Sequence, residues 1–103
     1  MTESEFNELA DAVFGHIEQT LDGSDADIEY NINGPVLELE CTDGSQLIIN
    51  RHGPNREIWL AAKSGGFHYS YRDGRWMSGR DGSELFDKLA ELVKAASGAT
   101  VKF

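Results

Sequence analysis

Hydrophobic residues in the first 22 positions recur every three or four residues, which is the spacing of one face of an α-helix. They are Phe6, Leu9, Ala10, Val13, Phe14, Ile17 and Leu21. Thr2 followed by Glu5 has the spacing of a capping box, and Asp22-Gly23 is a typical helix end. The pattern predicts one long amphipathic helix. Gly15 interrupts it, at a cost of about 1 kcal/mol relative to alanine.

From residue 26 to residue 78 the pattern changes to short runs rich in β-branched and aromatic residues. These runs predict strands near 26–32, 36–42, 46–51, 57–62, 67–71 and 75–78. Turn-forming sequences separate them: Asn33-Gly34-Pro35, Asp43-Gly44-Ser45, His52-Gly53-Pro54-Asn55, Ser64-Gly65-Gly66 and Asp73-Gly74. Because short strands joined by tight turns form hairpins, we expect an antiparallel sheet of about six strands.

A second helical pattern follows the last strand. Asp81 with Glu84 predicts its start and Gly98 its end. Its apolar stripe comprises Leu85, Phe86, Leu89, Leu92, Val93 and Ala96. The order of helix, strands and helix predicts an α+β sandwich in which both helices pack on one face of the sheet. With 103 residues, 40% of them hydrophobic, the chain is expected to form a single domain over residues 1–103.

Charge is distributed unevenly along the chain. The first fifty residues contain twelve Asp or Glu and no Lys or Arg, whereas the remainder contains nine Lys or Arg and six acids. The formal charge of -9 therefore divides into -12 and +3. This imbalance favours an acidic face that meets something cationic, either a metal ion or a basic protein. It argues against nucleic acid, whose phosphates such a face would repel.

Four acids of the first helix lie along one line opposite its apolar stripe, and we name them the acidic ridge. They are Glu8, Asp11, Glu18 and Asp22. In the first predicted strand three further acids alternate with residues that can turn to the core, and so share one side. They are Asp25, Asp27 and Glu29.

Solubility is the usual reason for acids on the polar side of a helix. Two details favour a contact surface instead. No Lys or Arg stands where it would relieve the repulsion, and Asp22 lies at the negative end of the helix dipole, where a cation is favoured. Oxygen ligands alone suit hard cations such as Ca²⁺, Mg²⁺, Mn²⁺ or iron, and the site would be exposed and weak.

Stronger metal and catalytic motifs are absent from the sequence. Asp25-x-Asp27-x-Glu29 resembles the start of an EF-hand loop, but Tyr30 and Val36 occupy the positions that require Gly and Glu. The histidines are too scattered to form a ligand set; they are His16, His52 and His68. No nucleophile signature or phosphate-binding loop is present, so we expect no enzyme activity.

Cys41 is the only cysteine, which excludes an internal disulfide and a CxxC zinc site. No apolar run approaches the roughly 18 residues of a membrane span, and the first residues lack the basic start of a signal peptide. We therefore expect a cytoplasmic protein that does not associate with membranes.

Trp59 is predicted to lie on the uncovered face of the sheet. In strand 57–62, Ile58, Leu60 and Ala62 share one face, which leaves Trp59 on the other. A large aromatic side chain there is a recognised anchor for partner proteins. It is equally suited to packing across strands, with His68 or Arg51 as neighbours. The pattern favours neither role.

Several segments together resemble the bacterial frataxin (CyaY) family. They are Ser4-Glu5-Phe6 to Leu9-Ala10-Asp11, Ile32-Asn33-Gly34, Ile48-Ile49-Asn50-Arg51, Ile58-Trp59-Leu60-Ala61, Gly65-Gly66 and the segment from Trp76 to Asp81-Gly82. They follow the family order over essentially the whole chain. The resemblance implies the frataxin fold, an antiparallel sheet flanked by two helices. It also implies a small iron-binding protein that docks on the cysteine desulfurase of iron-sulfur cluster assembly and adjusts its output.

The resemblance also implies which residues act. Iron, as Fe²⁺ or Fe³⁺, is expected to bind weakly at seven surface carboxylates: Glu3, Asp11, Glu18, Asp22, Asp25, Asp27 and Glu29. On this interpretation the desulfurase and the scaffold protein are contacted by Glu8, Glu18, Asp22, Asn50, Trp59 and His68. A monomer is expected without iron. Two alternatives stay open: a modulator of the desulfurase with no role for iron and, less favoured, an iron-storage or ferroxidase protein.

Overall fold

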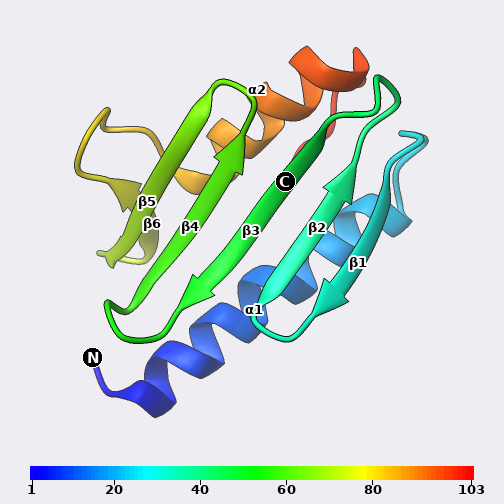
Figure 1. Ribbon diagram of the computed structural model, residues 1–103. Coiled ribbons are helices and arrows are strands. Elements are labelled where there is room, and N and C mark those ends of the chain that lie inside the picture. The colour runs from blue at the N-terminus through cyan, green and yellow to red at the C-terminus, as the bar shows by residue number, and fades with distance from the viewer.

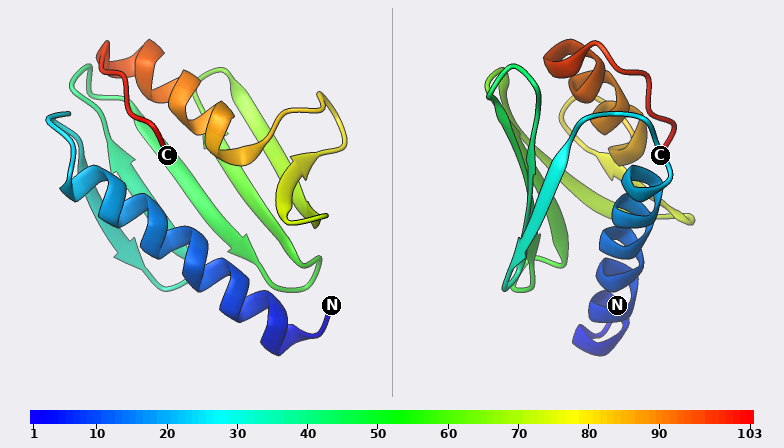
Figure 2. Two further views of the ribbon diagram at one scale, coloured as in Figure 1. Left: turned by 180° about the vertical axis from the view of Figure 1, so that it is seen from behind. Right: turned by 90° about the vertical axis from the view of Figure 1, so that its right-hand side faces the viewer.

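Two layers make up the computed structural model, which describes residues 1–103 (Figures 1 and 2). The elements are α1 (Glu3–Asp22), β1 (Glu29–Asn33), β2 (Val36–Glu40), β3 (Gln46–His52), β4 (Glu57–Ala62), β5 (Gly65–Arg72), β6 (Arg75–Ser78) and α2 (Leu85–Ser97). The six strands form one antiparallel sheet in chain order. Both helices lie on the same side of it, as the side view in Figure 2 shows. The predicted α+β fold is therefore confirmed. Neither helix is long and apolar enough to span a bilayer.

The start of α1 is fixed by its first residues. The backbone N–H of Glu5 donates to Thr2 Oγ1 and the backbone N–H of Thr2 donates to Glu5 Oε1, each over 3.1 Å. This is the predicted capping box, which satisfies two N–H groups that have no partner within the helix. The helix ends before Gly23, as predicted. Its buried residues are Phe6, Ala10, Val13, Phe14, Ile17 and Leu21.

Side chains of the strands alternate between the two faces of the sheet. Those that point to the helices and are buried include Leu37, Leu39, Leu47, Ile49, Ile58, Leu60 and Tyr69. They join the apolar stripes of α1 and α2 in one core of 19 buried residues. The opposite side, which no helix covers, is named the open sheet face (Figure 2).

The first strand is shorter than predicted. It was expected from residue 26, but β1 begins at Glu29, and Asp25 and Asp27 lie in the connection from α1. The reason lies in the neighbouring strand, because Glu29 is paired with Glu40, the last residue of β2. Beyond it the chain turns away, and the N–H of Cys41 donates to Ser45 O. Residues 26–28 therefore have no strand with which to pair.

The second helix begins later than predicted. Its N-cap is Glu84, whose carboxylate accepts the N–H groups of Phe86 and Asp87 at 3.0 and 3.1 Å. Asp81, the expected cap, instead accepts the N–H and the hydroxyl of Ser83. The intervening Gly82 has φ +72°, which is not helical, so the helix cannot start at Asp81. The predicted end at Gly98, with φ +75°, is confirmed.

The C-terminal residues return across the helix layer. In Figure 2 this segment runs down from α2 toward α1 on the side away from the sheet strands. Val101 is buried and belongs to the core, and Phe103 packs against it. Val101 and Phe103 thus add apolar side chains to the core from the C-terminal segment.

Candidate functional site

The acidic ridge lies on the outer side of α1, away from its buried stripe. Glu8, Asp11 and Asp22 are exposed, and Glu18 is half-buried. Glu3, the most N-terminal of the expected iron ligands, is also exposed but lies in the first helical turn. At 1.5 Å rise per residue it is separated from Asp22 by roughly 28 Å along the helix. Glu3 and Asp22 therefore cannot bind one ion together.

Asp11 is paired with a basic residue that lies forty positions away in the chain. One guanidinium N–H group of Arg51, in β3, donates a hydrogen bond to Asp11 Oδ1 at 2.5 Å, and another donates to the carbonyl oxygen of Asn7 at 2.8 Å. Its side chain is only 17% exposed, whereas that of Asp11 is 72% exposed. The guanidinium also lies 5.4 Å from the centre of the Phe14 ring. Arg51 thus connects α1 to the sheet and neutralises Asp11, whereas Glu8 forms no salt bridge.

The C-terminal half of the ridge is joined to β1. The hydroxyl of Tyr30 donates to Asp22 Oδ1 at 2.8 Å. This hydrogen bond, together with desolvation and the charges of Asp22 and Glu18, raises the pKa of Tyr30. Neither carboxylate takes part in a salt bridge. Two acids without basic partners therefore remain at this end of the helix.

The acids beyond α1 have the alternation that the sequence predicted, although only Glu29 lies in a strand. Asp25, Asp27 and Glu29 are exposed, and the residues between them are half-buried. Glu29 is directly opposite Glu40 on the open sheet face. Asp27, Glu29 and Glu40 line a polar hollow of about 180 Å³ with Cys41 and Thr42.

Glu40 and its neighbour Glu38 were not singled out from the sequence. The run Val36–Glu40 contains the signal, because Leu37 and Leu39 alternate with the two acids. Cys41 beside them is buried, and burial raises the pKa of its thiol. A thiol that stays protonated at neutral pH is a poor metal ligand. The donors in this region are therefore carboxylate oxygens.

The expected iron ligands do not converge on a single point. No three His, Cys, Asp or Glu side chains are placed so that they could hold one metal ion. Asp11 is already paired with Arg51. The remaining exposed carboxylates offer hard oxygen donors, the ligand type that iron accepts, but each would contribute one or two bonds with water completing the coordination. The chemistry fits weak binding at the surface.

Trp59 is stacked between two histidine rings on the open sheet face. The ring centres of His52 and Trp59 are 3.9 Å apart and those of Trp59 and His68 are 4.3 Å apart, each with an interplanar angle of 10°. The three residues come from β3, β4 and β5, and Trp59 is directly opposite His68. The predicted packing against His68 is confirmed. Arg51 points to the other face, so its suggested contact with Trp59 was wrong.

Hydrogen bonds hold this stack in place. The indole Nε1 of Trp59 donates to Glu57 Oε1 at 2.9 Å, and Ser70 Oγ donates to the other carboxylate oxygen at 3.4 Å. Asn50, the third residue expected on this face, is opposite Trp59 in β3 and is half-buried. The structure therefore brings Asn50, Trp59 and His68 together in one row of the sheet.

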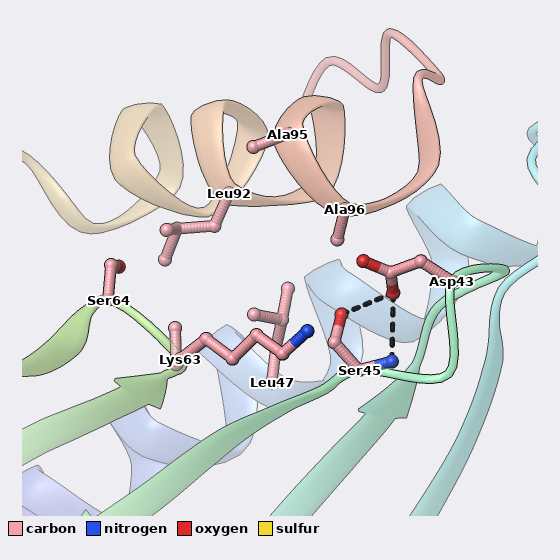
Figure 3. A pocket seen from close by; sticks show the side chains of 9 residues that line it. Asp43, Ser45, Leu47, Lys63, Ser64, Leu92, Ala95 and Ala96 are labelled. Atoms are coloured by element: carbon pink, nitrogen blue, oxygen red, sulfur yellow. Dashed lines mark hydrogen bonds between the residues drawn. The ribbon is translucent and has the colours of Figure 1, made fainter.

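A further hollow of about 150 Å³ lies between α2 and the turns that precede β3 and β5 (Figure 3). Its polar groups are used locally, because Asp43 accepts the N–H and the hydroxyl of Ser45 at 2.8 and 2.5 Å. These hydrogen bonds lower the pKa of Asp43. Lys63 extends along the hollow, and Leu47 and Leu92 form its apolar wall (Figure 3). We assign this hollow to the packing of α2 on the sheet.

The sequence matches the frataxin-like domain family over residues 1–99. The chain belongs to this family. The frataxin-like relatives include the iron-sulfur cluster assembly protein CyaY of Neisseria meningitidis serogroup B, 47% identical over 102 residues that cover 99% of this chain and 95% of that protein. The CyaY protein of Neisseria gonorrhoeae is 46% identical with the same coverage. The resemblance seen in the sequence is thus confirmed.

Solved frataxin structures agree with the fold. Frataxin from Psychromonas ingrahamii superimposes with a TM-score of 0.95 at 39% identity, covering 99% of this chain and 97% of that one. The trimeric frataxin of Saccharomyces cerevisiae, complexed with ferrous iron, gives a TM-score of 0.71 at 28% identity, with coverages of 96% and 88%. The sheet with two helices on one face is therefore the frataxin fold.

Proposed function

We propose that this protein takes part in iron-sulfur cluster assembly as a non-enzymatic adaptor that binds iron weakly. It docks on the cysteine desulfurase through the acidic ridge, and the open sheet face makes a second contact with the desulfurase and its scaffold protein. The observation that carries the proposal is a group of exposed carboxylates without salt bridges, in a chain that matches CyaY proteins along its length. They are Asp22, Asp25, Asp27 and Glu29, together with the half-buried Glu18.

The same carboxylates suit two cationic partners. Fe³⁺ is a hard cation and Fe²⁺ a borderline one, and oxygen donors bind both; exposed donors that do not converge allow ready release. A basic protein surface would be attracted by the same charge, which acts mainly on the association rate and orientation. Asp11 is the weakest of the expected ligands, since Arg51 already neutralises it.

A modulator of the desulfurase without a role for iron is the second candidate, because the same acids account for docking alone. An iron-storage or ferroxidase enzyme is less well supported. Such proteins build their metal sites from inward-facing carboxylates and histidines. In this chain the one buried polar residue is Ser78, and all carboxylates lie outside the core.

Metal titration separates the two adaptor roles. Anaerobic Fe²⁺, or Co²⁺ in its place, should broaden the backbone amide signals of residues 18–29 first. Replacing three acids in this segment, Asp22→Asn, Asp25→Asn and Asp27→Asn, should abolish the broadening. The matched control, Asp73→Asn with Asp87→Asn and Glu91→Gln, removes three acids elsewhere and should leave it unchanged. Broadening centred on the histidines would contradict binding at carboxylates.

Docking is tested by a cluster reconstitution assay. Purified desulfurase and scaffold are assayed with and without this chain at several iron concentrations, and the rate of cluster formation is followed. We expect the wild-type protein to change the rate and the triple Asp→Asn variant to change it less than the matched control does. An unaltered rate at every iron concentration would refute the adaptor role.

A further inference from the structure

The open sheet face carries opposite charges at its two sides. On β1 and β2 its charged residues are Glu29, Glu38 and Glu40, and at the end of the β5–β6 hairpin they are Arg72 and Arg75. Glu38 and Glu40 alternate with buried leucines, and Arg75 precedes the buried Trp76, which places all three on this face. The face therefore has an acidic side and a basic side.

The central strands between these two sides present little free charge. On this face β3 contributes Gln46, Ile48, Asn50 and His52, and β4 contributes Trp59 and Ala61 beside Glu57. Glu57 is the one carboxylate there, and it accepts hydrogen bonds from Trp59 and Ser70. The ring stack of Trp59 thus stands between an acidic and a basic region.

Arg72 and Arg75 are arranged unfavourably for folding. They are directly opposite each other at the end of the hairpin, and both are exposed. Neither forms a salt bridge, because the three salt bridges of the structure involve Arg51 and Lys88. Like charges directly opposite in a sheet destabilise it. The two arginines oppose formation of the hairpin, so contact with a partner molecule explains their presence better than stability of the fold does.

We infer that the open sheet face binds a partner protein in one orientation, with partner carboxylates against Arg72 and Arg75 and partner basic groups against Glu29, Glu38 and Glu40. The Trp59 stack supplies the apolar contact between them. Nucleic acid and anionic membranes do not fit, because the acidic side and the formal charge of -9 would repel them. The inference rests on the proposed function, in which the desulfurase and scaffold contact this face, and adds the charge pattern that their surface must have.

Two single charge reversals test the orientation. Arg75→Glu places a carboxylate opposite Arg72, and Glu40→Arg places a guanidinium opposite Glu29. Each should raise the melting temperature, because it replaces a like-charged cross-strand pair with an opposite-charged one. Each should also weaken binding to the purified desulfurase–scaffold complex by about tenfold at low salt. Lys102→Glu is the control for Arg75→Glu, because this exposed lysine forms no salt bridge and lies in the C-terminal segment beside the helices.

The two reversals change the net charge in opposite directions, which distinguishes orientation from overall attraction. Weaker binding by both, with Lys102→Glu within about twofold of wild type, would support the inference. Arg75→Glu binding as well as Lys102→Glu, or Glu40→Arg binding more tightly than wild type, would overturn it and leave the proposed function standing. Arg72→Glu serves as a second variant of the basic side. Failure of the wild-type protein to bind the complex would refute the proposed function and this inference together.

Discussion

Trp59 is held by contacts on both faces of its indole ring, with His52 on one side and His68 on the other. Its N–H is bonded to Glu57. The ring cannot adopt other rotamers without breaking these contacts, so little side-chain entropy would be lost when a partner covers it. What the residue offers a partner is the edge of a preorganised stack. The same contacts give Trp59 a share in the stability of the sheet.

Trp59→Ala tests these roles at the residue scale. Loss of the ring should weaken binding to the desulfurase–scaffold complex by about 2 kcal/mol or more if Trp59 is a hot spot. The salt dependence of binding should not change, because the lost contact is apolar. Affinity at several salt concentrations and a thermal melt would be measured together. A folded Trp59→Ala variant with unaltered affinity would assign Trp59 to the fold alone.

Gly15 lies in the middle of α1, and a Cβ atom added there would meet no atom within 4 Å apart from its chain neighbours and the adjacent helical backbone. Neither a close approach nor a positive φ requires glycine at this position. Gly15→Ala should therefore raise the free energy of unfolding by up to about 1 kcal/mol. Urea denaturation would measure it. Gly98→Ala is the contrasting control and should destabilise, because Gly98 has φ +75°. A destabilised Gly15→Ala variant would show that this position has a role that packing does not reveal.

At the scale of elements, the sequence correctly predicted the features that depend only on residues close together in the chain. The stripe of α1 and its capping box follow from residues within one or two turns, and the alternation of Leu37 and Leu39 marks a face directly. The remaining features depend on distant residues. Asp25 and Asp27 lie outside β1 because β2 has already turned away, and Asp11 is neutralised by an arginine forty positions later. No spacing rule reports such contacts, so the acidic ridge seemed more uniform in the sequence than it is.

The turn before α2 gives a pH-dependent prediction. Hydrogen bonds from the hydroxyl and the N–H of Ser83 lower the pKa of Asp81 from 3.8 to about 2. Because the folded value lies below the unfolded one, ionised Asp81 stabilises the fold fully above about pH 4, and this contribution disappears as the pH falls toward about 2. Asp81→Asn should therefore be less stable than wild type at pH 7, with the difference shrinking toward pH 2. Ser83→Ala should reproduce part of the loss. Urea denaturation across this range would measure both, and a difference independent of pH would contradict the assignment.

At the scale of the whole molecule, folding brings acidic side chains close together, and few salt bridges reduce the repulsion between them. The first fifty residues carry no Lys or Arg, and Arg51 is the only later basic residue that forms a salt bridge with one of their acids. The surface around Asp22, Asp25 and Asp27 is therefore repulsive in the free protein. Added salt or a bound cation should reduce this repulsion. The same acidic side chains therefore destabilise the free protein and are available to bind a cation or a basic partner.

The melting temperature should rise with salt concentration, because screening weakens the repulsion among the many unpaired acids more than it weakens the three salt bridges. A divalent cation at equal ionic strength should raise it further, since binding to the folded state adds stability by mass action. Asp25→Asn with Asp27→Asn should reduce both effects, whereas Asp87→Asn with Glu91→Gln should reduce them less. Differential scanning calorimetry in NaCl and then in MgCl₂ or anaerobic FeCl₂ would measure the shifts. A melting temperature that falls with salt would mean that attractive charge pairs dominate the surface. A cation that binds without raising the melting temperature would mean that the unfolded chain binds it equally well.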